Sequence, residues 1–250
     1  MSVAQQIIAL GGGGFSMEAT PFLDDYILAA SGKQKPRVCF VPTASGDADG
    51  YVSRFYRHFA SKDCECSDLE LFRRHVIDLE DFACSQDVIY VGGGNTVNML
   101  AVWRAHGFDK ALQAALISGT LLTGISAGSI CWFEQGVTDS FGLELQRLDC
   151  LGFLKGSNCP HYDGESERRP AYHKLVQSGM LAGYAADDGV GLHFINGNLN
   201  RVVSSRPNAK GYRVELAGGN VVEHQLEIIS LEINQFAHPP HASDGEGRRR

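Results

Sequence analysis

The sequence predicts an α/β fold: a mostly parallel sheet with helices on both faces, followed by an antiparallel extension at the C-terminal end. Three observations support this class. Apolar strand-like runs alternate with segments of helical periodicity through the first half of the chain. Glycine-rich turns follow three of the strands, and short strands with turn signals fill the last part. Such alternation is typical of a parallel sheet covered by helices on both faces.

The elements of the first half follow from the spacing of apolar residues. The helix at 95–108 is well marked, because Asn95 is a favourable N-cap and Gly107 a favourable C-terminal stop. The expected strands lie at 6–13, 36–45, near 69–72, 87–95 and 120–126, and the expected helices at 21–31, 49–62, 95–108, 108–119 and 127–136. In such sheets, active sites lie outside the carboxyl ends of the strands, where the three glycine-rich turns fall.

The second half of the chain has a different pattern. Residues 137–165 are rich in loop-forming residues, and a helix is expected at 168–179, with Pro170 in its first turn and Gly179 at its end. From residue 182 onward, short strands dominate, and the stretches NGN and GGN are hairpin signals.

The bulk properties limit the class of protein. We expect one domain over 1–237 and a flexible tail over 238–250. The formal net charge of -7 gives no support to a nucleic-acid partner. The N-terminus has no basic segment and only a short apolar run, so neither a signal peptide nor a membrane span is expected. The seven cysteines, an odd number, favour the reduced thiols of a cytoplasmic protein over a disulfide framework.

A zinc site is a weak alternative for one group of residues. Cys64 and Cys66 lie near His58 and His75 in the sequence. Their C-x-C spacing lacks the fixed ligand pattern of structural zinc sites, so no metal is expected.

Two of the glycine-rich turns raise the question of an anion site. The run GGGGFS at 11–16 lacks the third glycine of G-x-G-x-x-G, and the next strand lacks the acidic end that a dinucleotide site needs. A tight turn with close backbone approach explains 11–14 better. In VGGGNT, successive glycines before a helix leave N–H groups free to hold an anion or a developing oxyanion, although simple turn chemistry explains the run equally well.

The third turn, Gly124-Ile-Ser126-Ala-Gly128, matches the G-x-S-x-G pattern of a nucleophile elbow. A serine on a sharp strand-to-helix turn has a strained backbone and needs small neighbours. The turn exposes the serine Oγ above the sheet and directs the N–H of Ala127 towards a developing oxyanion. The alternative is an ordinary turn in which glycine and serine simply fit.

A serine nucleophile needs a base, and His161 is the favoured candidate among nine histidines. Pro160 constrains the backbone just before it. His58 and His173 fall within expected helices and His193 within an expected strand, where structural roles are the better explanation.

The base in turn needs a carboxylate that holds its tautomer and stabilises the imidazolium. Asp188 in AADDG and Asp139 in GVTDSFG are the leading candidates. Both lie in turn contexts, where aspartate is common for local hydrogen bonding, so a structural role is open for each.

Taken together, YVGGGNTVNML, GISAGSICW and CPHYDGE resemble the aspartyl dipeptidase (peptidase E) and cyanophycinase family of serine peptidases. The similarity runs from the first strand to about residue 200, and the GGGNT and GxSAG pair is more specific than either part. The resemblance implies a class I glutamine-amidotransferase-like three-layer sandwich, in which serine takes the place of the amidotransferase cysteine.

The resemblance implies a role for each matching residue. Ser126 matches the nucleophile and His161 the histidine of the P-H-[FY] loop. Gly93, Gly94 and the N–H of Ala127 match the oxyanion hole.

The acid departs from the family pattern. The third member is typically a Glu in a GLPEG-like turn, whereas AADDG here places Asp188, which is one methylene shorter. Asp139 matches another acid that the family carries just after the nucleophile helix. Asp188 is the first choice and Asp139 the alternative. Aspartyl dipeptidases also hold the acidic N-terminal residue with basic groups beyond the histidine, for which Arg168 and Arg169 are the candidates here.

The sequence therefore predicts a cytoplasmic serine-type peptidase, a dipeptidase E-like exopeptidase of small peptides, with dipeptides that carry N-terminal Asp as candidate substrates. Neither a metal nor an organic cofactor is expected, the partner is a small peptide rather than nucleic acid or membrane, and a monomer and a homodimer both stay open. Two alternatives are the same machinery acting on another small amide or ester, and a catalytically silent ligand-binding homologue.

Overall fold

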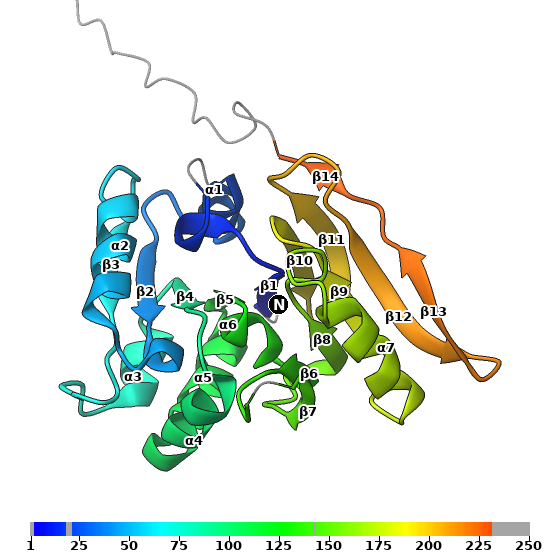
Figure 1. The fold of residues 1–250 in the computed structure, drawn as a ribbon. Coiled ribbons are helices and arrows are strands. Elements are labelled where there is room, and N and C mark those ends of the chain that lie inside the picture. Colours follow the sequence, from blue (N-terminus) through cyan, green and yellow to red (C-terminus); the bar gives the residue numbers. More distant parts are fainter. Residues whose placement is uncertain (1–2, 19–21, 143, 232–250) are drawn as a thin grey trace, which may run out of the picture.

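The computed structural model describes residues 3–18, 22–142 and 144–231, whose strands form two sheets (Figure 1). The larger sheet has eight strands in the order β14-β11-β10-β1-β5-β4-β2-β3, and the smaller has six in the order β13-β12-β9-β8-β6-β7. The centre of the larger sheet is parallel, since β1 pairs with β5, β5 with β4, β4 with β2 and β2 with β3 in that sense. β10 and β11 extend it in antiparallel fashion.

The strands are β1 (Gln6–Leu10), β2 (Arg37–Val41), β3 (Glu65–Asp68), β4 (Val88–Val91), β5 (Leu121–Ile125), β6 (Phe133–Thr138), β7 (Gln146–Asp149), β8 (Leu154–Cys159), β9 (Gly183–Ala186), β10 (Val190–Ile195), β11 (Asn198–Ser204), β12 (Gly211–Ala217), β13 (Asn220–Gln225) and β14 (Ile229–Ser230). The helices are α1 (Phe22–Ala30), α2 (Asp49–Phe59), α3 (Leu79–Cys84), α4 (Thr96–His106), α5 (Phe108–Ser118), α6 (Ala127–Ile130) and α7 (Arg168–Gln177), with 3-10 turns η1 (Gly14–Ser16) and η2 (Thr43–Ser45).

Alternating residues of the central strands face two different hydrophobic clusters. On β1, Ile8 belongs to the cluster that contains Leu23 of α1 and Phe55 of α2. Its neighbour Ile7 belongs to the cluster that contains Trp103 of α4. Figure 1 shows α1 and α4 on opposite sides of these strands. The predicted α/β class, with helices on both faces of a mostly parallel sheet, is confirmed.

Local sequence signals act as expected at several turns. The Asn95 side chain accepts a hydrogen bond from the N–H of Asn98 at 2.9 Å and so caps α4. Gly107 ends that helix with a φ of 72°, which favours glycine. In the NGN turn between β10 and β11, Asn196 and Gly197 have φ values of 49° and 78°, the positive pair that a tight hairpin turn requires.

Local structure departs from the expectation at three places. The helix expected at 127–136 ends at Ile130, and β6 begins at Phe133. The segment expected to be loop-rich, 137–165, includes the end of β6 and all of β7 and β8. The expected helix ends early because of a tertiary contact: Phe133 packs against Phe194 of β10, with ring centroids 5.6 Å apart. Pairing of β6 with its neighbouring strands overrides the local helix propensity. The strand expected near 69–72 ends earlier, at Asp68, where its pairing with β2 ends.

The smaller sheet positions two loops, one after β8 and one after β9. Its strands β8 and β9 are parallel neighbours, with Cys159 opposite Ala185. β8 ends two residues before His161, and β9 ends two residues before Asp188. Because parallel strands end at the same edge of a sheet, these two residues emerge side by side. Helix α7 covers this sheet and contributes Tyr172 to its core.

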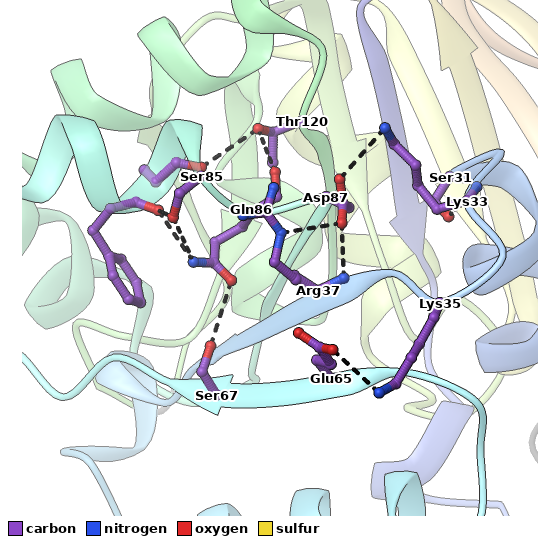
Figure 2. A network of polar contacts seen from close by, with 12 residues as sticks. Ser31, Lys33, Lys35, Arg37, Glu65, Ser67, Ser85, Gln86, Asp87 and Thr120 are labelled. Carbon is purple, nitrogen blue, oxygen red and sulfur yellow. Dashed lines mark hydrogen bonds and ion pairs between the residues drawn. The ribbon is translucent and has the colours of Figure 1, made fainter.

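The edge of the larger sheet where the parallel strands begin is held by polar contacts (Figure 2). Asp87, just before β4, accepts a hydrogen bond from the N–H of Arg37 at 2.8 Å and lies 3.9 Å from Lys33 Nζ. Thr120, just before β5, donates its hydroxyl to the carbonyl of Gln86 at 2.9 Å. These contacts join the starts of neighbouring strands, so this edge has a structural role.

Each helix in the described part of the chain is too short or too polar to cross a lipid bilayer. The tail predicted at 238–250, with His238 and His241, lies outside the described residues. That expectation and the single domain predicted for 1–237 stay predictions.

Candidate active site

Ser126 follows β5 directly and has a strained backbone. Its φ of 57° and ψ of -113° are rare for a residue with a side chain. The flanking glycines are required by packing: a Cβ on Gly124 would lie 2.5 Å from the Gly128 carbonyl oxygen, and one on Gly128 would lie 2.3 Å from the Val91 carbonyl oxygen. The glycines of the G-x-S-x-G pattern therefore let β5, α6 and β4 approach closely enough to fix the serine at the sheet edge.

His161 and Asp188 form a hydrogen-bonded pair. Nδ1 of His161 lies 2.7 Å from Oδ1 of Asp188, and the two side chains are 12% and 23% exposed. The backbone of His161 is also in the left-handed region, with a φ of 54°, and its N–H donates to the carbonyl of Gly11 at 2.8 Å. A carboxylate facing Nδ1 favours the tautomer that carries its proton there, which leaves Nε2 as a free acceptor.

The first glycine-rich turn, at 11–14, packs directly against this pair. A Cβ on Gly12 would lie 1.9 Å from Oδ1 of Asp188 and 3.1 Å from Nδ1 of His161. A Cβ on Gly11 would lie 2.2 Å from the Asp187 carbonyl oxygen. Close backbone approach is what the sequence predicted for 11–14. The partner of that approach was not predicted, because nothing near 11–14 in the sequence points to residues 161 and 188.

Strand register places Ser126 beside Gly11, which contacts the backbone of His161. Leu10 of β1 pairs with Ile125 of β5, so Gly11 and Ser126 are the next residues on two neighbouring strands. His161 is bonded to Gly11 through its backbone. The serine and the histidine thus share one edge of the larger sheet. Within residues 3–18, 22–142 and 144–231, no hydrogen bond joins Ser126 Oγ to His161.

Of the two glycines predicted for the oxyanion hole, Gly93 lies beside the serine, whereas Gly94 packs against the backbone of Ala44 and Ser45. A Cβ on Gly93 would be 3.2 Å from Ser126 Cβ and 3.8 Å from its Oγ, so only glycine leaves this space open. Gly94 has a φ of 139°, and a Cβ there would meet the Ala44 carbonyl oxygen at 2.2 Å. Ala127 is buried as the first residue of α6. Because α6 has only four residues, its dipole is small and the individual N–H groups matter more.

Asp139, the alternative acid, lies in a different setting. It is exposed, and its carbonyl accepts the N–H of Gly142 at 3.0 Å. The next residue, Ser140, accepts the N–H of Thr96 at 2.8 Å, so this loop caps the start of α4. Among the described side chains, no ion pair or hydrogen bond joins Asp139 to His161. The structure brings Asp188 to the histidine and leaves Asp139 on the loop.

A guanidinium that the sequence reasoning missed holds the Asp188 loop. Arg206 donates from Nε to the Asp188 carbonyl at 3.0 Å and pairs with the Asp163 carboxylate. Asp163 in turn accepts the N–H of Asp188 at 3.0 Å. No local signal identifies Arg206, which follows β11 and reaches this loop only through the fold.

The two arginines considered for an acidic substrate group are already paired within the chain. Arg168 is 4% exposed and donates to Glu165 at 2.7 Å. Arg169 pairs with Glu223 and lies over the ring of Tyr162, 5.3 Å from its centroid. Both cations therefore stabilise α7 and its neighbours.

Four histidine and cysteine side chains outside this pair lie in structural settings. His193 is hydrogen-bonded to the Tyr26 hydroxyl at 2.7 Å, and burial lowers its pKa to about 4, which keeps it neutral. Cys64 and Cys66 have their sulfurs 3.6 Å apart. His58 lies 3.3 Å from a carboxylate oxygen of Asp24 instead. The described residues contain no group of three or more His, Cys, Asp or Glu side chains arranged to hold a metal ion.

Two solved structures share this fold. A peptidase from an acI-B1 Actinobacterium superposes with a TM-score of 0.69 at 15% identity, over 91% of this chain and 95% of that one. A Listeria monocytogenes EGD-e protein described as a putative peptidase E superposes with a TM-score of 0.57 at 16% identity, over 90% of this chain and 100% of that one. Both superpositions cover at least nine-tenths of this chain, so the two proteins share its two-sheet α/β fold.

Sequence relatives identify the family. The chain is 54% identical to a Bacillus subtilis (strain 168) protein, the uncharacterized peptidase YgaJ, over 92% of this chain and 98% of that protein. It is 25% identical to peptidase E of Actinobacillus pleuropneumoniae serotype 7 (strain AP76), over 72% of this chain and 79% of that protein. The model of peptidase family S51 matches residues 7–202. The chain belongs to peptidase family S51, which confirms the predicted peptidase E-like family.

Proposed function

We propose that this peptidase is a serine exopeptidase that hydrolyses small peptides, including dipeptides with N-terminal Asp, through an acyl-enzyme on Ser126. The observation that carries the proposal is the convergence of a strained serine after β5 with a His161–Asp188 pair at the same sheet edge. The peptidase E name of one relative and the resemblance of the motifs to aspartyl dipeptidases support the substrate class.

Acylation uses the free nitrogen of the histidine. Nε2 of His161 takes the proton from Ser126 Oγ as the oxygen attacks the carbonyl carbon of the scissile peptide bond. The imidazolium that forms is stabilised by Asp188, which faces Nδ1 at 2.7 Å. The C–N bond then breaks, and the proton on Nε2 passes to the leaving amine. Deacylation repeats the sequence with water, and Ser126 regains its proton from His161.

Charge on the carbonyl oxygen develops towards the glycine-rich turn after β4. Gly93 and Ala127 lie next to the serine on two different elements, and we assign their N–H groups as the donors. Fixed donors of this kind stabilise a tetrahedral oxyanion without reorganising, and removing one typically costs about 10²- to 10³-fold in rate. The assignment explains why Gly93 has no side chain.

The test is hydrolysis of a dipeptide panel that includes Asp-Leu, Asn-Leu and Ala-Leu, with the wild type and Ser126→Ala compared. We expect Asp-Leu to be hydrolysed fastest by the wild type, and Ser126→Ala to lose at least about 10³-fold in rate while its melting temperature is retained. Hydrolysis by Ser126→Ala at the wild-type rate contradicts the serine mechanism. Equal rates on all three dipeptides contradict the preference for Asp and leave the mechanism standing.

A further inference from the structure

The side chain of Tyr51, on α2, contacts the glycine-rich turn that follows β4. Its hydroxyl accepts a hydrogen bond from the N–H of Gly93 at 3.3 Å. Gly93 is the residue whose missing side chain leaves space beside Ser126, since a Cβ there would lie 3.8 Å from Ser126 Oγ. The phenol therefore contacts a backbone donor of the proposed oxyanion hole. The inference below rests on the proposed function.

Packing fixes the position of the tyrosine ring. Its centroid lies 4.9 Å from that of Phe40 and 5.6 Å from that of Phe15. A Cβ on Gly92 would lie 2.9 Å from Cε1 of the ring, so the glycine turn allows the ring to approach the loop directly. With the ring held on three sides, the remaining freedom is rotation of the hydroxyl proton about the C–O bond.

The hydrogen-bond inventory leaves that proton available. A phenol has one O–H donor as well as acceptor lone pairs. Here an acceptor position is used by the Gly93 N–H, and the hydroxyl also contacts Ser16 Oγ. Ser16 lies in η1 at the end of the GGGGFS turn and is only partly buried. In the free protein the phenol thus accepts the Gly93 N–H, and in its contact with the partly buried Ser16 hydroxyl either oxygen can be the donor.

We propose that Tyr51 is a catalytic residue, which donates its hydroxyl proton in a hydrogen bond to the oxyanion of the tetrahedral intermediate formed on Ser126. Two donors whose heavy atoms are 3.3 Å apart, Tyr51 Oη and Gly93 N, can both lie about 2.9 Å from one oxygen atom. When the carbonyl oxygen of the substrate arrives, the Gly93 N–H turns to it from the phenol, and the phenol proton turns to it from Ser16. No proton is transferred, so the tyrosine stays neutral throughout. Burial raises the pKa of Tyr51, which keeps it a donor across the neutral range.

The experiment uses Tyr51→Phe, which keeps the ring and removes the hydroxyl. Two rates are measured: covalent labelling of Ser126 by a fluorophosphonate, whose phosphoryl oxygen occupies the oxyanion position, and kcat with KM for Asp-Leu. We expect labelling and kcat to fall about 10²-fold while KM changes less than about threefold, because the bond forms only in the tetrahedral state. The melting temperature reports whether the variant is folded.

Tyr56→Phe is the matched control on the same helix. The Tyr56 hydroxyl donates to Asp68 at 2.6 Å, on the exposed side of α2, so this variant should label and turn over at the wild-type rate. Ser16→Ala removes only the resting partner of the phenol and should retain most of the activity. A loss in Ser16→Ala as large as that in Tyr51→Phe would show that the contact only positions the loop.

The possible outcomes separate the two proposals. A wild type that labels at Ser126 together with a Tyr51→Phe variant that matches it in kcat overturns the role of Tyr51 alone. A Tyr51→Phe variant in which only KM rises also overturns it, because the hydroxyl would then act in ground-state binding. A folded wild type that neither labels nor hydrolyses dipeptides overturns the proposed function, and the role of Tyr51 with it.

Discussion

Gly12→Ala should separate the catalytic base, His161, from its acid, Asp188, although neither of these two residues is substituted. The added Cβ would lie 1.9 Å from Oδ1 of Asp188. A carbon and an oxygen that are not bonded keep about 3.3 Å apart, so the carboxylate or the turn must move by roughly 1.4 Å. The same Cβ is 3.1 Å from Nδ1 of His161, which blocks retreat in that direction.

That displacement sets the size of the effect. The 2.7 Å bond between Nδ1 of His161 and Oδ1 of Asp188 cannot survive a shift of this size. A hydrogen bond to a charged group contributes about 1.5–3 kcal/mol, and a misplacement of about 1 Å in a catalytic group costs about 10²-fold in rate. We therefore expect kcat/KM for Asp-Leu to fall at least about 10²-fold in Gly12→Ala.

The assay compares Gly12→Ala with Gly50→Ala. A Cβ on Gly50 meets nothing within 4 Å, and the residue lies in α2, so this control should keep full activity and gain up to about 1 kcal/mol of stability. Steady-state kinetics and fluorophosphonate labelling are measured for both variants, with thermal unfolding as the test of folding. Wild-type kcat/KM in a folded Gly12→Ala variant would refute the role assigned to the His161–Asp188 pair.

Three further predictions concern the acids and metals. Asp188→Asn should lower kcat by about 10³- to 10⁴-fold because it favours the wrong histidine tautomer, while Asp139→Asn should stay within about twofold of the wild type; kinetics in which Asp139→Asn is the more damaged variant would contradict this. Asp24 is fully buried, and burial raises its pKa from 3.8 to about 8, so the folded state binds its proton more tightly than the unfolded state. The stabilisation that protonated Asp24 contributes to the folded state is complete below about pH 4 and is lost as the pH rises towards 8. The free energy of unfolding of Asp24→Asn should therefore exceed that of the wild type by an amount that grows between pH 5 and pH 8, at up to about 1.4 kcal/mol per pH unit. A difference in unfolding free energy that is the same at every pH would contradict the assignment. Hydrolysis of Asp-Leu should be unchanged by EDTA, and loss of activity that zinc restores would point to a metal-dependent reaction.

The parts of the fold predicted from the sequence are those with local causes. The caps of α4 depend on Asn95 and Gly107 alone, and the first hairpin turn depends on Asn196 and Gly197. The G-x-S-x-G pattern located Ser126 at a strained strand end, because that backbone tolerates only small residues on either side. In each case the residue type and its immediate neighbours specify the conformation.

The parts that could not be predicted depend on contacts between distant segments. Phe133 begins a strand rather than continuing a helix because Phe194 and β8 are its neighbours in space. Tyr51 and Arg206 reach the site from elements whose sequences carry no catalytic motif. The close packing of Gly12 against Asp188 becomes apparent only when the turn after β1 and the turn after β9 are brought together in the fold.

The most direct test of the account is the site and rate of fluorophosphonate labelling, read by mass spectrometry of the intact protein and its peptides. The account predicts one label per chain, located on Ser126, with a rate that falls at least about 10²-fold in His161→Ala because the serine loses its base. Labelling at another residue, or labelling of Ser126 at the same rate in His161→Ala, would contradict the claim that Ser126 is a nucleophile activated by His161.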